Sequence, residues 1–211
     1  LNEGYEIGSV GTVMPDVEVK IGENNEILLR GKTITTGYYK KPEATAAAID
    51  RDGWFHTGDA GYLKDSHLYL TERIKDLFKT SNGKYISPQA LETKLAIDRY
   101  IDQIAVIADE RKFVSALIVP VYGFVKDYAK EKGIAYSNMD ELLQHPKIQA
   151  LFRARIDTLQ QQFAHYEQVK RFTLLTEPFS MERGELTNTL KLKRSVVAKN
   201  YKGLIDKMYE E

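Results

Sequence analysis

The sequence predicts an α+β protein with a β-rich first part and an α+β second part. Short strand patterns and turn residues dominate residues 1–74, whereas longer helical patterns mixed with a few strands dominate residues 75–211. The stretch from Glu72 to Pro88 separates them, with a basic and polar start, a Gly turn and a Ser-Pro helix start. We therefore expect a β-rich part at 1–74, followed by a domain with a short sheet and packed helices at 75–211.

Composition excludes several classes of protein. The 211 residues are 43% hydrophobic and 28% charged, as in ordinary globular proteins, and 30 Lys and Arg balance 30 Asp and Glu. This balance gives no electrostatic support for nucleic-acid binding. There is no Cys, four scattered His suggest no metal site, and no apolar run approaches the ~18 residues of a membrane span. The chain starts at Leu1 rather than Met, so we expect it to begin inside a longer protein.

Alternating apolar and polar residues predict strands in the first part. Residues 17–21 and 27–29 flank the turn composition of residues 22–25, which indicates a hairpin. A short helix is expected at 42–49, with Pro42 at its first position. Two further short strands are expected at 62–63 and 67–71. Trp54 and His56, between the helix and these strands, are interpreted as packing or loop residues.

The second part alternates helices and strands. Ser87 caps an expected helix that starts at Pro88, and β-branched runs at 104–108 and 113–119 predict an antiparallel hairpin. Helices are expected at 124–132 and, most clearly, at 146–163, where apolar residues share one face. A strand at 169–175, a mobile polar segment at 180–189 and one terminal amphipathic helix complete the prediction.

Four segments of characteristic sequence occur in order along the chain. They are residues 37–45 (GYYKKPEAT), 54–59 (WFHTGD), 73–88 (RIKDLFKTSNGKYISP) and 185–194 (ELTNTLKLKR). Each is weak alone, but their order and spacing resemble the C-terminal part of the acyl-adenylate-forming enzymes. The sequence of residues 76–80 and 84–88 is most similar to the long-chain fatty acid-CoA ligase branch of that superfamily. This resemblance covers nearly the whole chain.

The resemblance implies ribose-binding roles for Asp59 and Arg73. The Asp59 carboxylate would accept hydrogen bonds from both ribose hydroxyls of ATP or AMP, because two oxygens can accept from two adjacent donors. Arg73 would be the second ribose contact and could also reach a phosphate oxygen. Read without the resemblance, Asp59 is a turn residue after Gly58 and Arg73 a solvated residue at a strand end.

The resemblance also implies a hinge and a coenzyme A approach at the junction. Lys75 stands where the family places the pivot of its small domain, and the adjacent Asp76 could serve instead. Gly83 would face the pantetheine of coenzyme A, since a residue without a Cβ lets a ligand pass close to the backbone. Asn82-Gly83 is also a turn signal by itself, and many relatives carry Arg where Tyr85 stands.

Lys191 resembles the catalytic lysine of the family. Its ammonium would meet the substrate carboxylate and the α-phosphate during adenylation and neutralise the charge that builds there. Residues 186–190 set its register. A basic tail, with Lys193 and Arg194 nearby, is the plain alternative.

Together the resemblance implies a C-terminal fragment of a long-chain fatty acid-CoA ligase, with fatty acid, ATP and coenzyme A as substrates and Mg²⁺ as cofactor. The family's phosphate-binding loop and its magnesium-binding Glu are absent from these 211 residues, so the metal ligand and the N-terminal domain are expected elsewhere in the same longer chain. Two alternatives remain: a fatty acyl-AMP ligase that loads a carrier protein, or a non-catalytic module. A cytoplasmic location, with peripheral membrane association, is expected from the lipid substrate alone.

Overall fold

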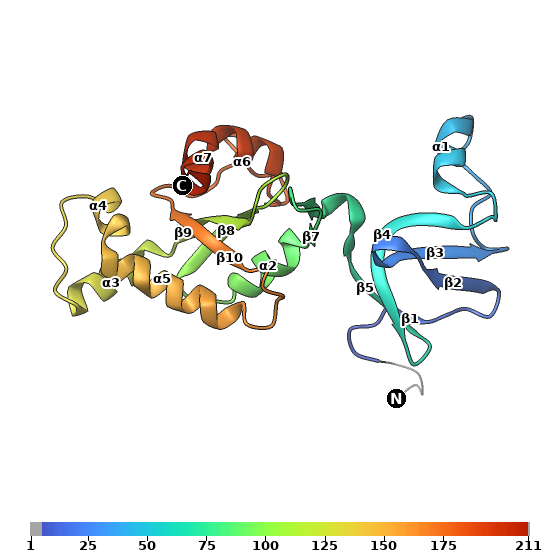
Figure 1. Ribbon diagram of the computed structural model, residues 1–211, viewed down its shortest axis with the longest axis horizontal. Helices are drawn as coiled ribbons and strands as arrows, with labels where there is room; N and C mark the ends of the chain where they lie inside the picture. The colour runs from blue at the N-terminus through green and yellow to red at the C-terminus, as the bar shows by residue number, and fades with distance from the viewer. Residues whose placement is uncertain (1–5, 211) are drawn as a thin grey trace. The chain divides into compact units, whose positions relative to one another are not determined.

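The computed structural model describes residues 6–210, except for the side chain of Lys75. The chain forms two compact units, Leu1–Leu77 and Phe78–Glu211, referred to below as unit 1 and unit 2 (Figure 1). The boundary lies three residues after the one expected from the sequence. Within the described range no helix is long and apolar enough to cross a membrane.

Unit 1 is built on a five-stranded antiparallel sheet with the order β1-β5-β4-β3-β2. Its strands are β1 (Gly11–Thr12), β2 (Val17–Ile21), β3 (Glu26–Gly31), β4 (Phe55–Lys64) and β5 (His67–Arg73). The predicted β2–β3 hairpin is confirmed, with Val17 opposite Gly31 and Ile21 opposite Ile27. A short 3₁₀ turn, η1 (Glu23–Asn25), closes it. The helix α1 (Pro42–Ala48) is also as predicted.

The strand β4 is longer than the sequence predicted. We expected only a short strand at 62–63 here, but β4 runs from Phe55 to Lys64. Glycines at 58 and 61 hid the strand pattern, and pairing with β3 and β5 on both sides compensates for them. Asp65 and Ser66, both at positive φ, form the two-residue turn into β5.

Unit 2 contains a three-stranded sheet with the order β10-β9-β8. The strands β8 (Ile101–Ile107) and β9 (Val114–Pro120) form the predicted antiparallel hairpin, and β10 (Val169–Leu174) joins β9 in parallel. A parallel neighbour needs a long connection, which here contains α3 (Tyr122–Glu131), α4 (Met139–Gln144) and α5 (Pro146–Leu159).

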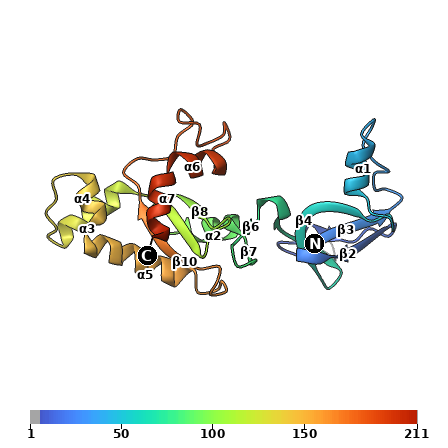
Figure 2. The ribbon, with the colours of Figure 1, turned by 45° about the horizontal axis from the view of Figure 1, so that its top comes forward.

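Helices cover both faces of this sheet, as the two views in Figures 1 and 2 show. Alternate residues of β9 point to opposite faces: Ala116 and Ile118 belong to one apolar cluster, whereas Leu117 and Val119 belong to the other. The first cluster includes residues of α2 (Pro88–Leu95), α3, α4 and α5, and the second includes residues of α6 (Arg194–Asn200) and α7 (Lys202–Tyr209). Every residue of β9 is buried, which explains its continuous apolar sequence.

Unit 2 differs from the sequence predictions in two elements, and burial bears on a third segment. The terminal helix is two helices, α6 and α7, which meet at Tyr201. The helix α4 was missed, although Asn138 caps it by accepting a hydrogen bond from the Glu141 amide at 2.9 Å. The segment 180–189, expected to be loosely held, has Glu185 and Leu186 buried in its middle. Polar residues suggested exposure, but these two are held by specific contacts described below.

A two-stranded hairpin, β6 (Phe78–Lys79) and β7 (Tyr85–Ile86), opens unit 2. Its tip rests against the β8–β9 turn, because the Ser81 amide donates to Arg111 O at 3.0 Å and the Glu110 amide donates to Lys79 O at 2.8 Å. The predicted Ser87 cap of α2 is confirmed by the Ala90 amide, which donates to Ser87 Oγ at 3.2 Å. The first hairpin is therefore part of unit 2 rather than a free linker.

Candidate functional site

The segment 57–59 bulges out of the sheet of unit 1. His56 of β4 pairs with Leu28 and Ala60 pairs with Glu26, so three residues of β4 lie opposite the single residue Ile27 of β3. Bulges of this kind redirect a side chain and occur frequently beside active sites. The sequence therefore builds a local distortion at the position of the predicted nucleotide contact, Asp59.

Two side chains hold this bulge. Thr57 Oγ1 donates to Ile27 O at 2.7 Å and accepts from the Asp59 amide at 3.1 Å. Glu26 Oε1 accepts from the Gly58 amide at 3.0 Å, where Gly58 has a φ of 71° that favours glycine. Neither Glu26 nor Thr57 was identified from the sequence, since their roles depend on a strand pairing that local patterns do not reveal.

Asp59 and Arg73 lie side by side, as expected for two contacts to one ligand. They are directly opposite in the β4–β5 pairing, and Arg73 Nε lies 3.3 Å from Asp59 Oδ1. The Arg73 side chain is 74% exposed and that of Asp59 33% exposed. Both charged groups can therefore meet a ligand in solution, and the carboxylate keeps a second oxygen for further hydrogen bonds.

Arg73 also lines an open hollow of about 610 Å³. Other lining residues are Tyr38, Phe55, His56 and Gly58. His56 was interpreted as a packing or loop residue, but its Nδ1 lies 2.9 Å from Glu26 Oε2 and its Nε2 lies 3.7 Å from Asp50 Oδ2. His56 is thus a half-exposed residue that lines the hollow, with its ring oriented by Glu26 and Asp50. Trp54, half-buried, packs beneath the Arg30 guanidinium 4.5 Å away, consistent with a packing role.

The predicted hinge residues lie in the 3₁₀ turn η2 (Ile74–Asp76) at the end of unit 1. The Leu77 amide closes this turn on Ile74 O at 3.1 Å, and the Asp76 side chain is exposed. For Lys75 only the backbone is described. The compact units part immediately after this turn, between Leu77 and Phe78.

Gly83 occupies the tip of the first hairpin of unit 2. Its φ is 74°, and a Cβ added to it would meet no atom within 4 Å. The Gly83 amide donates to Thr80 O at 2.8 Å, and Thr80 in turn binds Lys84 through both its amide and its hydroxyl. Gly83 is therefore required by the turn and also leaves open space next to the backbone.

Lys191 lies on a further short hairpin of unit 2, residues 186–192, which we call the Lys191 hairpin. Leu186 pairs with Leu192 at its neck, the Thr187 amide donates to Lys191 O at 2.8 Å, and the Lys191 amide donates to Thr187 Oγ1 at 3.0 Å. The Lys191 side chain is exposed and forms no ion pair or hydrogen bond with any residue in the described part of the chain. Its ammonium is thus available to a ligand.

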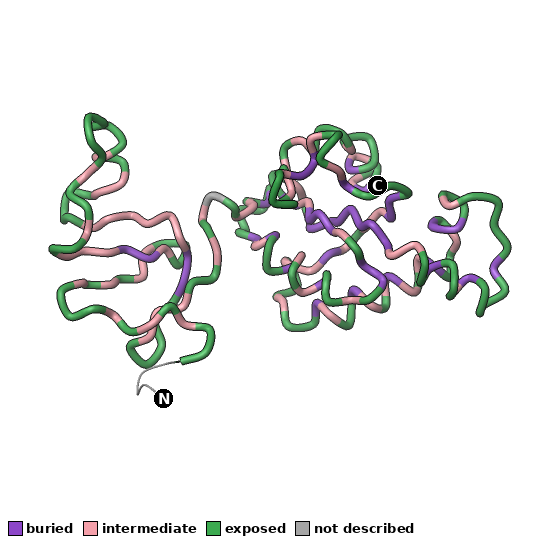
Figure 3. The backbone as a smooth tube through the Cα atoms, turned by 180° about the vertical axis from the view of Figure 1, so that it is seen from behind, coloured by how far each residue is buried: buried purple, intermediate pink, exposed green. Residues whose placement is uncertain are grey.

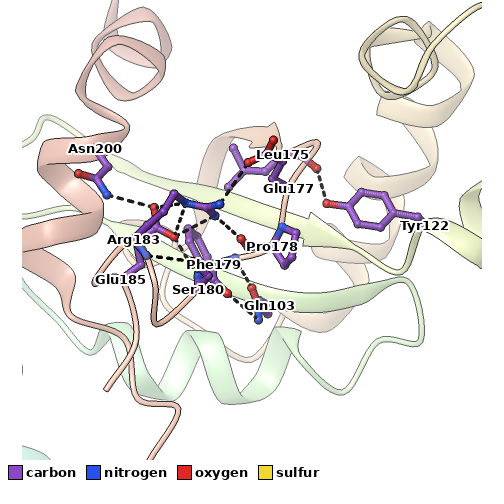
Figure 4. Close-up of polar contacts among 10 residues, drawn as sticks. All are labelled: Gln103, Tyr122, Leu175, Glu177, Pro178, Phe179, Ser180, Arg183, Glu185 and Asn200. Atoms are coloured by element: carbon purple, nitrogen blue, oxygen red, sulfur yellow. Dashed lines mark hydrogen bonds and ion pairs between the residues drawn. The ribbon is translucent and has the colours of Figure 1, made fainter. Parts of the chain in front are cut away.

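Two carboxylates, the buried Glu185 and the partly buried Glu92, are bound next to the two ends of this hairpin, and neither was identified from the sequence. Glu185 precedes it and is held by Arg183, Asn200 and the Ser180 amide (Figure 4). Burial alone would raise the pKa of Glu185, but the hydrogen bonds from Arg183, Asn200 and Ser180 outweigh it and lower that pKa below its ordinary value. Glu92 of α2 binds Arg194, which follows the hairpin.

No group of three or more His, Cys, Asp or Glu within residues 6–210 could hold a metal ion. The carboxylates just described are each committed to Arg, His or backbone partners. These residues therefore do not fit a Mg²⁺ site.

The sequence is similar to known ligases over nearly its whole length. The long chain acyl-CoA synthetase 7, peroxisomal, of Arabidopsis thaliana is 35% identical over 97% of this chain and 32% of the relative. The long-chain-fatty-acid–CoA ligase FadD15 of Mycobacterium tuberculosis is 32% identical over 97% of this chain and 34% of the relative. The chain thus spans about one third of the length of these curated relatives.

A solved structure supports the fold. The adenylation domain of a carboxylate reductase from Mycobacterium chelonae matches with a TM-score of 0.69 and 25% identity, over 99% of this chain and 34% of that chain. The model of the AMP-binding enzyme C-terminal domain family matches residues 75–211. The chain therefore belongs to the AMP-binding enzyme family, of which residues 75–211 form the C-terminal domain.

Proposed function

We propose that residues 1–211 are the C-terminal part of an ATP-dependent ligase that joins a long-chain fatty acid to coenzyme A. The fatty acid carboxylate would attack the α-phosphate of ATP to give an acyl-adenylate and diphosphate. The coenzyme A thiolate would then attack the acyl carbon and release AMP. The observation that carries this proposal is the 32–35% identity of nearly the whole chain to long-chain acyl-CoA ligases.

In this proposal, Asp59 and Arg73 bind the ribose of ATP and AMP. Their opposite positions on β4 and β5 and the bulge that presents Asp59 support this assignment. A carboxylate beside a guanidinium offers acceptors and donors within one hydroxyl-binding site. The exposure of both groups supports it further, because a purely structural ion pair gains little at the surface.

Lys191 would serve the first step, adenylation. Its ammonium would contact the reacting carboxylate and the α-phosphate and stabilise the negative charge that develops between them. The support is an exposed lysine without a partner among the described residues, on a hairpin whose backbone is fixed by the Thr187 contacts. A charge held ready in a defined position requires little reorganisation during the reaction.

Gly83 would serve the second step, transfer to coenzyme A. The open space beside its backbone suits the passage of the pantetheine chain. Lys75 and Asp76 in η2 would be the pivot about which residues 75–211 turn between the two steps. Each orientation would then pre-organise different groups around one site.

Mg²⁺ would be bound by residues outside this sequence, in the N-terminal domain of the same ligase. A cytoplasmic location with peripheral contact to the membrane belongs to the same proposal, because the substrate is a lipid. The word "peroxisomal" in the names of two Arabidopsis relatives provides a second location to test.

A carrier-protein thiol is the second candidate for the acyl acceptor. The family resemblance described above implies Arg in many relatives at the position of Tyr85, near Gly83. In this structure its ring lies 5.8 Å from the Lys79 ammonium. The adenylation step would be the same, and only the thiol that enters beside Gly83 would differ.

A hybrid ligase tests the proposal. In it, residues 1–211 replace the matching C-terminal third of the Mycobacterium tuberculosis ligase FadD15. The folded hybrid should catalyse palmitate-dependent exchange of diphosphate into ATP and should form palmitoyl-CoA, whereas the remaining FadD15 segment without the graft should do neither. A folded hybrid without exchange contradicts the proposal. Exchange without palmitoyl-CoA, but with acylation of a carrier protein, favours the second candidate.

A further inference from the structure

The Lys191 hairpin is held to the body of unit 2 at both of its ends. Before it stands Glu185, whose side chain is 1% exposed, and after it stands Arg194, which binds Glu92, 12% exposed. The Lys193 amide donates to Glu185 O at 2.8 Å and so ties the two ends together. Lys191 lies only two residues before this bond.

Both carboxylate oxygens of Glu185 are engaged. Arg183 Nε lies 3.1 Å from each oxygen, Asn200 Nδ2 donates to Oε1 at 3.1 Å, and the Ser180 amide donates to Oε2 at 3.0 Å. Figure 4 shows these donors arriving from different segments around one buried carboxylate. Charge-assisted hydrogen bonds of this kind are stronger than neutral ones, and their number fixes the orientation of Glu185.

The surrounding loop is fixed in turn to the sheet and to α6. The Phe179 amide donates to Gln103 Oε1 of β8 at 2.6 Å, and the Phe179 ring packs on Tyr201 with 5.7 Å between ring centroids. Arg183 additionally binds Glu177 at 3.1 Å and Pro178 O. These contacts therefore fix the loop, and with it the first residue of the Lys191 hairpin, relative to β8 and Tyr201.

At the other end, Arg194 forms two bonds to Glu92, at 2.5 and 2.6 Å. Glu92 Oε1 also accepts from the Val106 amide of β8 at 2.8 Å. A hairpin with exposed tip residues would by itself sample many orientations. Anchoring both ends to β8, α2 and α6 restricts the volume in which the Lys191 ammonium can move.

We propose that Glu185 is a positioning residue for Lys191: through its contacts with Arg183, Ser180 and Asn200 it holds the neck of the Lys191 hairpin in the orientation needed for adenylation. This inference rests on the proposed function of Lys191. A displacement of about 1 Å can cost ~100-fold in rate, so a residue that never touches the substrate can control this step.

The variant Glu185→Gln preserves the size of the side chain but removes its charge. One oxygen becomes an NH₂ group, which cannot accept from Arg183 or from its other donors. Asp98→Asn is the matched control. Asp98 is also a buried carboxylate, bound by Arg155 at 2.7 Å and by the Tyr100 amide at 2.8 Å, and it lies outside the loop and hairpin described here.

Amide hydrogen exchange on the 211-residue chain tests the structural part. In Glu185→Gln the Thr187, Lys191 and Lys193 amides should exchange about 10–100-fold faster, the factor expected from losing a charged hydrogen bond. Amides of β9 should change no more than they do in Asp98→Asn. Unchanged exchange in the hairpin of Glu185→Gln would overturn the inference.

Kinetics of the hybrid ligase test the functional part. Glu185→Gln should lower diphosphate exchange by about 10–100-fold but leave thioester formation from supplied acyl-adenylate nearly unchanged. In the Lys191→Ala background, Glu185→Gln should have no further effect on the rate of diphosphate exchange, because Glu185 acts through Lys191. Equal losses in both backgrounds, or a loss no larger than in Asp98→Asn, would overturn the inference. An inactive parent hybrid would instead contradict the proposed function. Amide hydrogen exchange on the 211-residue chain would still test whether Glu185 holds the Lys191 hairpin in place.

Discussion

The two units hold their exposed charged residues by different means. In unit 1 the buried apolar side chains of the described residues are Ile27, Leu28 and Ala60 alone, whereas unit 2 has a buried apolar cluster on each face of its sheet. Figure 3 shows this contrast as little purple in the first unit and many purple stretches in the second, where β9 is buried along its whole length. Backbone pairing organises unit 1, and side-chain packing organises unit 2.

This difference extends to the candidate site. Asp59 is placed by strand register and by a bulge that Thr57 and Glu26 hold, so its position depends on the pairing of β4 with β3 and β5. Lys191 is placed by ion pairs that tie a small hairpin to a packed core. A sheet with few buried apolar side chains is adequate to hold the proposed ribose contact, while an exposed hairpin needs separate anchors.

The largest effect should appear when the units are separated. Residues 78–211 alone should fold and unfold cooperatively, because they contain both apolar clusters. Residues 1–77 alone should show no cooperative thermal transition, because they bury too little apolar surface to offset the entropy of ordering. Circular dichroism melting of both fragments measures this. A sharp transition in residues 1–77 would remove the contrast between the units.

A comparison of two glycines of unit 2 separates the effect of backbone strain on stability from an effect on transfer to coenzyme A. Gly83 and Gly133 both have positive φ, and an added Cβ would meet nothing within 4 Å at either. Each Gly→Leu variant should therefore lose about 1–2 kcal/mol of stability from the left-handed backbone alone. In the hybrid ligase, transfer to coenzyme A should slow only in Gly83→Leu, and diphosphate exchange should persist. Equal transfer rates in the two variants would argue against a coenzyme A approach at Gly83.

Acid should weaken the Lys191 anchor. Hydrogen bonds lower the pKa of Glu185 in the folded protein despite its burial, so its contribution to stability is present above the unfolded pKa of about 4.3 and is lost as the pH falls through the lower folded value. Urea unfolding between about pH 3 and 7 should thus show a shallower acid loss in Glu185→Gln than in the parent. The same slope in both proteins would show that the carboxylate is not ionised preferentially in the folded state.

The smallest effect on stability is expected at Arg73. Its ion pair with Asp59 is largely exposed, so Arg73→Ala should change the free energy of unfolding by less than about 1 kcal/mol. Affinity of the hybrid ligase for AMP should nevertheless fall, as measured by calorimetry. A large loss of stability without a loss of AMP affinity would make Arg73 a structural residue.

Local patterns were sufficient for most elements. The β2–β3 hairpin, α1, the Ser87 cap, the β8–β9 hairpin and α5 were all predicted, because each has a period or a capping residue within its own segment. The start of β4 and the break at Tyr201 were not predicted. The start of β4 was missed because its glycines weaken the strand pattern. The break at Tyr201 depends on packing of α6 and α7 against strands that are distant in sequence.

The candidate site was predicted only in part, namely where its residues lie in short motifs. Asp59, Arg73, Gly83 and Lys191 came from resemblance of short motifs, and the structure places the first two together and Lys191 on an exposed hairpin. Glu26, Thr57 and Glu185 could not be found in this way. Their contacts join residues that only the folded chain brings together, such as Glu26 with Gly58 or Glu185 with Asn200.

The central claim is that Lys191 acts in adenylation and not in thioester formation. The most direct measurement compares both half-reactions of the hybrid ligase in Lys191→Ala and in a control, Lys199→Ala, which removes another exposed lysine of unit 2. Lys191→Ala should slow diphosphate exchange by ~100–1000-fold and leave thioester formation from supplied acyl-adenylate nearly unchanged, while Lys199→Ala should affect neither. Equal losses in both half-reactions of Lys191→Ala would contradict this account.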